Sequence, residues 1–477
     1  MIIWIKIGII ALAAVLYLWC CRYYMAMFQQ NSYKADRYLN WLKSSPLPRS
    51  LKHAKVKFVF TARMKRLALT LGLLFILCSV LGHWAAVLCA ILSPFVLLMA
   101  NCLVSPVEKA ITRSYYKDAQ RILAEHKDLI IIGVTGSFGK TSTKHYLHRI
   151  LSEKYNVLMT PGNFNTTLGV VRTIREQLEP FHQVFIVEMG AKQPGDIKEI
   201  CDLVHPAIGI VTAVGKMHLE TFGSFENIQK TKFELINALP ANGLGVINME
   251  SEGIASYKDI PNHCPIITYG IDAHRADCRG VNISYSNAGM EFDFITKTTS
   301  EHFKSSLLGD CNVLNLCAAL CVAQHLRVPV EKQRLAVSKI MPVEHRLSIR
   351  RGAVTILDDA YNSNPDGAAM ALSVLRDMQL AEGAVKAVIT PGFVEMGQAQ
   401  AEECKKLGFR AAKCTDILVI VNKHNREAIH AGALEGGMEQ ERIILADNLT
   451  QAQQLLAPRL TAGSVVLYEN DLPDTFI

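Results

Sequence analysis

The stretch that decides the fold is Leu129-Ile130-Ile131-Ile132-Gly133-Val134-Thr135-Gly136-Ser137-Phe138-Gly139-Lys140-Thr141-Ser142-Thr143. An apolar run typical of a β-strand leads into a glycine-rich turn, which is followed by a segment of helical character. Backbone N–H groups in such a turn, together with a helix N-terminus, form a concave site for phosphate oxygens. Lys140 is placed to reach the outer phosphates of a nucleotide, and the Thr141 hydroxyl is placed to hold Mg²⁺.

One glycine of this stretch is out of register with the strict phosphate-loop pattern. That pattern requires glycine at position 134, where the chain has valine, and the glycine stands one residue earlier, at Gly133. A glycine turn without a ligand would not explain why Lys140-Thr141 follows at the right offset. We therefore interpret the stretch as a variant phosphate loop that binds a nucleotide.

Hydrophobic residues are unevenly distributed along the 477-residue chain, which is long enough for two or three domains. Residues 1–20 and 67–104 are nearly continuous hydrophobic sequence, and the rest reads as an ordinary soluble protein. We predict three transmembrane helices, at 2–20, 67–82 and 84–104. A cleaved signal peptide is the rival interpretation of the first one, but no small-residue cleavage site follows the apolar run, which continues into Cys20-Cys21-Arg22.

The basic charge of the chain is confined to one segment. The net charge is +7, but residues 21–66 contain eleven Lys and Arg and one acidic residue, so this segment has a charge of +10 and the rest −3. Such a segment beside apolar helices is typical of a cytoplasmic membrane surface, not of a nucleic-acid site. We predict a multi-pass cell-membrane protein with a basic cytoplasmic loop at 21–66 and cytoplasmic catalytic domains. The thirteen cysteines include no C-x-x-C pair, which argues against a zinc ribbon and fits a reducing cytosol.

From residue 129 onward, strand-like runs alternate with helical stretches, which predicts a parallel α/β architecture. Four of these runs end in polar residues. Residues 131–132 lead into the phosphate loop, 184–187 end at Glu188, 208–211 lead to His218, and 246–247 end at Asn248. Ligands of open parallel sheets bind beyond the carboxyl ends of the strands, so these side chains are expected to converge on the loop.

The strand pattern restarts near residue 341. Residues 354–357 end at Asp358-Asp359, and further strand-like runs follow at 387–389, 417–421 and 465–467. We therefore predict a membrane region at 1–104, a central ATP-binding domain at 105–341 and a C-terminal α/β domain at 342–477.

The sequence alone does not decide the roles of three residues near the predicted site. Glu188 is the kind of strand-end carboxylate that holds Mg²⁺ against phosphates. His218 is either a second metal ligand or a hydrogen-bonding residue of its loop. Lys232 reads, from composition, as a solvated helix lysine.

An ordered series of motifs resembles the Mur ligases, the ATP-dependent enzymes that add amino acids to the stem peptide of the cell wall. The motifs are Thr135–Ser142, Thr160–Asn165, Glu188–Ala191, Gly215–Glu220 with Phe222–Ser224, Thr231–Glu234, Gly309–Asn315, Arg346 and Asp359–Pro365. The series covers about residues 130–400, and it resembles the type that adds D-alanyl-D-alanine in its 219–224 and 358–362 segments. It implies a central ATPase domain with a parallel sheet and a Rossmann-like C-terminal domain.

The resemblance implies an ATP-dependent, ADP-forming amide ligation. A substrate carboxylate becomes an acyl phosphate, and an incoming amine then displaces phosphate through a tetrahedral intermediate. Lys140 and Mg²⁺ would stabilise the transferring phosphoryl group. The implied ATP-binding residues are Thr135, Gly136, Ser137, Phe138, Gly139, Lys140, Thr141 and Ser142 of the loop, Asn248 and Asn312 at the adenine, Arg346 at the phosphates and Asp359 at the ribose.

The resemblance also implies a metal set and a modified lysine. Thr141 and Glu188 would hold one Mg²⁺, and His218 would take part at a second. Lys232 matches a lysine that is often carbamylated in this family, and the added carboxylate would supply a metal ligand. The implied catalytic residues are Lys140, Glu188, His218 and Lys232.

The chain departs from the family mainly at its two ends. Membrane helices replace the usual N-terminal domain that binds the UDP-sugar, and Leu467–Pro473 lacks the Lys-Gly-Ser segment typical of D-alanyl-D-alanine addition. The acceptor therefore stays open between a UDP-MurNAc-peptide, a lipid-linked precursor and a polyglutamate-like polymer. A non-catalytic ATP-binding scaffold is a further hypothesis. A motor or signalling nucleotidase is disfavoured because Glu188 stands where a Walker-B aspartate would be expected.

Overall fold

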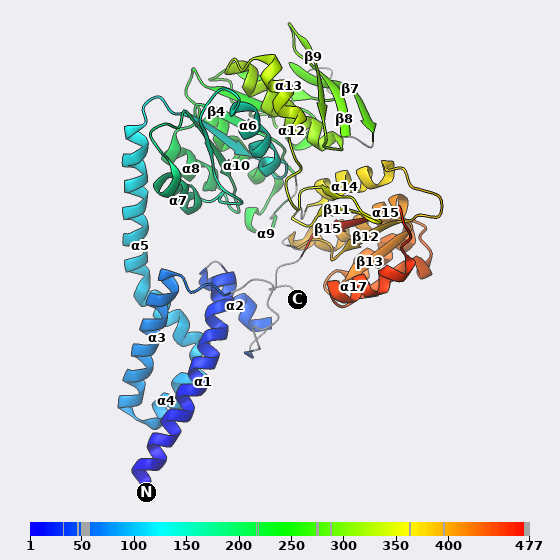
Figure 1. Cartoon of the computed structure of the whole chain (residues 1–477). Coiled ribbons are helices and arrows are strands. Elements are labelled where there is room, and N and C mark those ends of the chain that lie inside the picture. Colours follow the sequence, from blue (N-terminus) through cyan, green and yellow to red (C-terminus); the bar gives the residue numbers. More distant parts are fainter. Residues whose placement is uncertain are drawn as a thin grey trace. The chain divides into compact units, whose positions relative to one another are not determined.

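The computed structural model describes residues 1–471 of the chain, except 32, 45–46, 49–57, 216, 218, 273–275, 287–288, 362–363 and 395. These residues form two compact units, Met1–Tyr115 and Tyr116–Asp471 (Figure 1). The first unit is helical, and the second contains two separate β-sheets.

The first unit contains the helices α1 (Ile2–Gln30), α2 (Ala35–Ser44), α3 (Ala62–Leu81), α4 (His83–Ile91) and most of α5 (Ser93–Glu125). Three of the described helices, α1, α3 and α5, are long and apolar enough to cross a membrane. The predicted helices at 2–20 and 67–82 lie within α1 and α3. The predicted single helix at 84–104 is wrong in its bounds, because the chain breaks at Leu92 between α4 and α5. Pro94, in the first turn of α5, is compatible with a helix start but not with continuing α4.

Part of the predicted basic loop at 21–66 is helical. Helix α1 continues to Gln30, and α2 packs its aromatic face against it. The rings of Tyr38 and Phe28 lie 5.3 Å apart, and those of Trp41 and Tyr23 lie 5.9 Å apart. A bidentate ion pair between Arg66 and Glu108, with Nε–Oε1 at 2.6 Å, joins α3 to α5.

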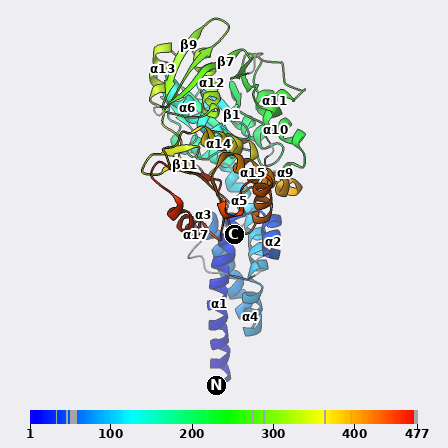
Figure 2. The same cartoon turned by 90° about the vertical axis from the view of Figure 1, so that its right-hand side faces the viewer.

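The first sheet of the second unit has nine strands in the order β2-β3-β1-β4-β5-β6-β7-β8-β9. The strands are β1 (Ile130–Thr135), β2 (Val157–Met159), β3 (Val184–Met189), β4 (Ile208–Val211), β5 (Leu244–Asn248), β6 (Ile266–Gly270), β7 (Cys278–Ser286), β8 (Gly289–Ile295) and β9 (Ser300–Ser305). The pairings from β2 to β7 are parallel, as predicted. The pairings of β8 with β7 and β9 are antiparallel and extend the sheet beside α13, an extension that the sequence pattern did not predict (Figure 2).

Helices cover both faces of this sheet. On one face lie α6 (Lys140–Leu151), α12 (Asp310–His325) and α13 (Val330–Ser338); on the other lie α7 (Thr167–Gln177), α8 (Asp196–Val204) and α10 (Phe225–Asn237). The short helices α9 (Leu219–Phe222) and α11 (Glu252–Ala255) lie in the loops. A parallel sheet covered on both faces needs nearly continuous apolar strands, and β1 and β3 have this character.

The second sheet has six strands in the order β10-β11-β15-β12-β13-β14. The strands are β10 (Ser348–Arg350), β11 (Thr355–Asp359), β12 (Lys386–Thr390), β13 (Ile417–Val421), β14 (Ile443–Ala446) and β15 (Val465–Glu469). Helices α14 (Pro365–Asp377), α15 (Gln400–Cys414) and α16 (Arg426–Glu435) cover one face, and α17 (Leu449–Leu456) covers the other. Only β10 among these described strands is antiparallel to its neighbour. The predicted α/β class is confirmed, and Met341–Pro342 lies between the two sheets.

The strand order places the phosphate loop after an interior strand of the first sheet. Strand β1 lies between β3 and β4, and the chain crosses over β1 when it passes from β3 to β4. Such a reversal of strand order leaves a crevice at the carboxyl ends of the strands. The residues that follow β1, β3 and β4 therefore meet at one place.

Candidate active site

The phosphate loop leaves β1 through two glycines that the backbone requires. Gly136 has φ +152°, and a Cβ there would lie 2.1 Å from Thr212 Oγ1. Gly139 has φ +80° and caps the N-terminus of α6, so the loop turns directly into that helix. Both positions need a residue without a side chain. The amides at the start of α6 face the region where an anion would be bound.

Two side chains hold the loop in shape. The Ser137 hydroxyl donates to Gly215 O at 3.1 Å and accepts from Gly215 N at 2.9 Å. Lys140 Nζ donates to Gly136 O at 2.6 Å and to Ser137 O at 3.1 Å, so its ammonium lies across the mouth of the loop. Burial lowers the pKa of Lys140 to about 8, and the positive charge of Arg346 acts in the same direction while Glu188 opposes it.

Glu188 lies next to Thr141, as the predicted magnesium pair requires. Thr141 Oγ1 donates to Glu188 Oε1 at 3.3 Å, and Asn165 Nδ2 donates to the same oxygen at 3.1 Å. The backbone N–H of Glu188 donates to the Thr160 hydroxyl at 3.0 Å. Three separate segments, at 141, 160–165 and 188, therefore converge on one carboxylate.

A second lysine, which the sequence reasoning missed, forms an ion pair with this carboxylate. Lys144 Nζ lies 2.9 Å from Glu188 Oε2 and donates to Gly162 O at 2.7 Å. The two side chains are only 0% and 1% exposed, so this is a fully desolvated ion pair. Burial by itself raises the pKa of Glu188, but Lys144 and then Lys140 outweigh it and hold the pKa below its ordinary value. The sequence signal that could have indicated Lys144 is its spacing of four residues from Lys140, which places both lysines on one face of α6.

The oxygen donors present fit a magnesium ion. Thr141 and Glu188 offer hard oxygen ligands beside the phosphate loop, and Mg²⁺ in nucleotide sites is usually held by one or two such protein ligands plus phosphate oxygens and water. No cluster of three or more His, Cys, Asp or Glu suited to a metal occurs among the described residues, which is compatible with that mode of binding. His218, the predicted second ligand, lies outside the described residues.

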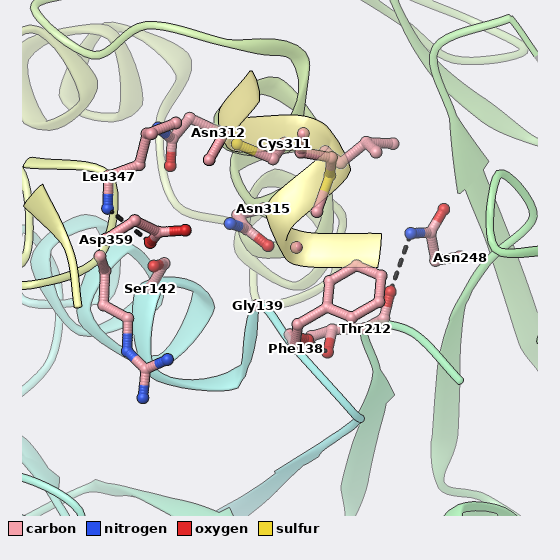
Figure 3. Close-up of a pocket in the computed structure, with 15 residues that line it drawn as sticks. Phe138, Gly139, Ser142, Thr212, Asn248, Cys311, Asn312, Asn315, Leu347 and Asp359 are labelled. Carbon is pink, nitrogen blue, oxygen red and sulfur yellow. Dashed lines mark hydrogen bonds between the residues drawn. The ribbon is translucent and has the colours of Figure 1, made fainter. Parts of the chain in front are cut away.

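A pocket that is open to solvent lies beside the loop. Figure 3 shows residues from four regions around it: the loop and α6, the carboxyl ends of β4 and β5, the start of α12, and the C-terminal domain. Its lining includes the predicted residues Phe138, Gly139, Ser142, Asn248, Asn312, Arg346 and Asp359. Residues 212, 311, 314, 315, 347, 367, 370 and 371 also line it, and they were not among the predicted set.

The polar pocket residues are held by hydrogen bonds to the fold. Asn248 Nδ2 donates to Thr212 O at 2.8 Å, and Asp359 Oδ1 accepts from Leu347 N at 2.9 Å; both contacts are drawn in Figure 3. Asn312 Oδ1 accepts from the Tyr146 hydroxyl at 2.7 Å. Side chains fixed in this way are preorganised for a ligand.

Several predicted residues do not line this pocket, among them Thr135 and Lys232. The Thr135 hydroxyl is buried and donates to Met189 O at 2.9 Å, so its visible role is to join β1 to β3. Lys232, on α10, is only 4% exposed and has no hydrogen-bond or ion-pair partner in the described part of the chain. Burial lowers its pKa to about 7, and the nearby charge of Lys140 adds to this effect. The structure thus contradicts the interpretation of Lys232 as a solvated helix lysine.

Removal of the Lys144 charge is expected to destabilise the protein. Lys144→Met leaves Glu188 buried without its cation and should cost about 3–5 kcal/mol of unfolding free energy. Lys144→Met with Glu188→Gln should regain most of this loss, because no uncompensated charge remains. Thermal unfolding of the full-length protein in detergent at pH 7 tests both variants, with Lys339→Ala as the exposed-lysine control.

The same variants give a pH signature. Because the native pair holds the pKa of Glu188 low, its stabilisation is present at neutral pH and is lost as the pH falls through that pKa. The difference in melting temperature between wild type and Lys144→Met should therefore shrink toward acid pH. Equal melting of the two proteins at pH 7 would contradict a stabilising pair.

Comparison with known proteins agrees with this geometry. The Mur ligase middle domain profile matches residues 134–323, and the profile described as the Mur ligase, glutamate ligase domain matches residues 345–468. The UDP-N-acetylmuramoyl-tripeptide–D-alanyl-D-alanine ligase (MurF) of Mycobacterium bovis is 30% identical over 363 residues, covering 71% of this chain and 70% of the relative. The enzyme of the same name from Escherichia coli is 27% identical over 339 residues, covering 70% of this chain and 74% of the relative.

Solved structures show the same relationship. The crystal structure of MurF ligase from Thermotoga maritima in complex with ADP superposes with a TM-score of 0.66 and 26% identity, covering 75% of this chain and 80% of that one. MurF from Acinetobacter baumannii superposes with a TM-score of 0.67 at 24% identity, covering 75% of this chain and 77% of that one. This likeness shows that the two proteins share a fold. The predicted resemblance is thereby confirmed. The chain belongs to the Mur ligase family, whose members are ATP-dependent, ADP-forming amide ligases.

Proposed function

We propose that this enzyme activates a substrate carboxylate with ATP and joins it to the amine of an amino acid or dipeptide, in the synthesis of a peptidoglycan precursor at the membrane. The observation that carries the proposal is the convergence of Lys140, Thr141 and Glu188 at the phosphate loop, beside a pocket lined by polar residues. Relatives that share this arrangement of domains are named for the ligation of D-alanyl-D-alanine to UDP-N-acetylmuramoyl-tripeptide.

The residues of the loop account for the first half of such a reaction. Phosphoryl transfer to a carboxylate builds negative charge on the phosphoryl oxygens, and the amides at the start of α6 are directed at that charge. Lys140 would exchange its two loop carbonyls for phosphate oxygens, which hold an ammonium more strongly because they are charged. Arg346 lies close enough to affect the pKa of Lys140, which is consistent with a role at the phosphates.

Magnesium would be held by Thr141 and Glu188 together with phosphate oxygens, and it would neutralise charge on the phosphoryl group. Asn165 and Lys144 keep the Glu188 carboxylate in place beside Thr141. Asn248, Asn312 and Asp359 would contact the nucleoside, since they line the pocket next to the loop.

The ligase assay is the direct test. Purified full-length protein with ATP, Mg²⁺ and a panel of stem-peptide acceptors, with and without D-alanyl-D-alanine, should release phosphate only when both substrates are present. Lys140→Ala and Glu188→Gln should each lower kcat/KM by at least about 100-fold, because each removes charge stabilisation at the phosphoryl group. Lys339→Ala, an exposed lysine changed in the same way, should keep wild-type activity.

One outcome of that assay would contradict the proposal, and another would change only the acceptor. ATP binding without substrate-dependent phosphate release, unaffected by Lys140→Ala, would identify a scaffold. Release with a lipid-linked or polyglutamate acceptor alone, with product masses to match, would keep the ligation but replace the UDP-linked acceptor.

Lys232 is expected to carry a carbamate. Its buried amine lacks a carboxylate partner in the described part of the chain, and a lowered pKa leaves much of it in the neutral form that attacks CO₂. Protein equilibrated with ¹³C-bicarbonate should show a carbamate carbon signal by NMR that grows as the pH rises through about 7. The signal should vanish in Lys232→Ala and persist in Lys230→Ala, an exposed neighbour; its absence from wild type would show that the lysine is unmodified.

The helices α1, α3 and α5 are expected to anchor the protein with its two α/β domains in the cytoplasm. Three crossings, with the basic segment 21–66 inside, place the N-terminus outside and residues after α5 inside. In intact spheroplasts, an N-terminal tag should be cut by added protease while a C-terminal tag is protected until the membrane is permeabilised. Release of the protein by alkaline carbonate would contradict membrane insertion.

A further inference from the structure

The two oxygens of the Glu188 carboxylate have different surroundings. Oε1 accepts from the Thr141 hydroxyl at 3.3 Å and from Asn165 Nδ2 at 3.1 Å. Oε2 lies 2.9 Å from Lys144 Nζ and receives no hydrogen bond from any other group in the described part of the chain. One oxygen therefore lies beside the hydroxyl that would hold magnesium, and the other is occupied by a buried ammonium group.

Lys144 is held firmly at Oε2. Its side chain is 0% exposed, and Nζ also donates to Gly162 O at 2.7 Å, so both a carboxylate and a backbone carbonyl fix the ammonium group. The helix that carries Lys144 is fixed as well, because the Tyr146 hydroxyl donates to Asn312 Oδ1 of α12 at 2.7 Å. Moving the ammonium group away would leave a buried carboxylate without its counter-ion, which is strongly unfavourable.

The carboxylate of Glu188 is held in one orientation. The backbone N–H of Glu188 donates to the Thr160 hydroxyl at 3.0 Å, and Glu188 pairs in register with Val134 of β1. Asn165 holds one carboxylate oxygen and Lys144 holds the other, so rotation of the group would break both contacts. Contacts of this kind orient a metal ligand. A metal ion beside Thr141 would therefore meet Oε1 alone.

The number of oxygens that a carboxylate offers affects the choice of divalent cation. Mg²⁺ needs near-ideal octahedral geometry at about 2.0–2.1 Å and keeps several waters, so one carboxylate oxygen is enough. Ca²⁺ takes six to eight oxygens at about 2.3–2.6 Å and readily accepts both oxygens of one carboxylate. A cation placed between the two oxygens of Glu188 would compete with Lys144 for Oε2 and would be repelled by its charge. Loss of that second oxygen disfavours Ca²⁺ more than Mg²⁺.

We propose that Lys144 determines which divalent cation the site accepts. Because Lys144 occupies Oε2, Glu188 has one oxygen left for the metal, and this arrangement favours Mg²⁺ over Ca²⁺. The inference rests on the magnesium site of the proposed function and adds its metal specificity. Lys144 is thus a positioning residue that acts through Glu188.

The relative affinity of the two metal–nucleotide complexes tests this role. Calorimetry of the full-length protein in detergent, with the Mg²⁺ or the Ca²⁺ complex of a non-hydrolysable ATP analogue, gives the ratio of the two affinities. Wild type should bind the Mg²⁺ complex more tightly. Lys144→Met should lower this preference by about 10-fold, the lower end of the range for residues that orient metal ligands.

The ratio separates metal specificity from simple neutralisation of charge. Removal of a nearby positive charge strengthens the binding of both cations alike, so a lysine that only neutralises Glu188 would leave the ratio unchanged. Lys144→Arg keeps a cation at Oε2 and should keep the preference for Mg²⁺. Lys339→Met, an exposed lysine changed in the same way, should also keep it.

A second measurement uses only the wild-type protein and does not depend on the folding of a variant. Crystal structures with the ATP analogue and either Mg²⁺ or Ca²⁺ should each show one Glu188 oxygen within about 2.6 Å of the ion. Lys144 should remain at the other oxygen in both structures. Coordination of Ca²⁺ by both oxygens of Glu188 would overturn the proposal.

The outcomes distinguish the role of Lys144 from the ligase function. Equal affinity of wild type for the two complexes, or an unchanged ratio in Lys144→Met, would overturn the role of Lys144. Substrate-dependent phosphate release by the same wild-type protein would then leave the ligase function standing. A preference for Mg²⁺ that depends on Lys144, without phosphate release from any pair of substrates, would support the role of Lys144 and contradict the ligase function.

Discussion

The buried ion pair between Lys144 and Glu188 is the interaction on which the rest of the site depends. Glu188 lies near the carboxyl end of β3, and without Lys144 its charge would be enclosed in protein with no cation at 2.9 Å to balance it. Because Thr141 and Asn165 bond to the other oxygen of the same carboxylate, the pair also determines where the phosphate loop and the 160–165 segment come to lie. The geometry of the proposed magnesium site thus follows from how one buried charge is neutralised.

Positive charge is concentrated around this carboxylate. The charges of Lys144 and Lys140 lower the pKa of Glu188. The pKa of Lys140 is itself lowered to about 8, because burial and the charge of Arg346 outweigh the opposing effect of Glu188. Cations held close together repel one another until polyanionic phosphates are bound. The site is therefore built for a ligand that brings several negative charges, and the adjoining pocket is lined by residues from both sheets of the second unit.

The second sheet has the opposite character at its corresponding edge. Asp359 and Glu469 end neighbouring strands, and Glu469 has no partner in the described chain. The two edges are similar in architecture, since each is the carboxyl end of a parallel sheet, but they differ in the charge that their strand-end residues supply. In this fold a few strand-end residues set the charge at each edge, while the helices and strands behind them supply rigidity.

Much of the architecture could be predicted because local patterns carry it. Apolar runs followed by glycine, and strands that end in polar residues, indicated the α/β class, the loop at 135–142 and the approach of Thr141 to Glu188. Periodicity did not indicate the antiparallel strands β8 and β9 or the break at Leu92, since short apolar runs fit more than one structure.

What the sequence by itself determined is which segments form strands and helices and which residue types end them, because these depend on neighbours along the chain. Only the tertiary structure decided which charges are paired. Composition indicated a solvated helix lysine at Lys232 and did not single out Lys144, yet Lys144 is paired with Glu188 and Lys232 is buried without a partner among the described residues. Burial and pairing depend on contacts between residues distant in sequence, and these contacts set the cost and the chemistry of a charge.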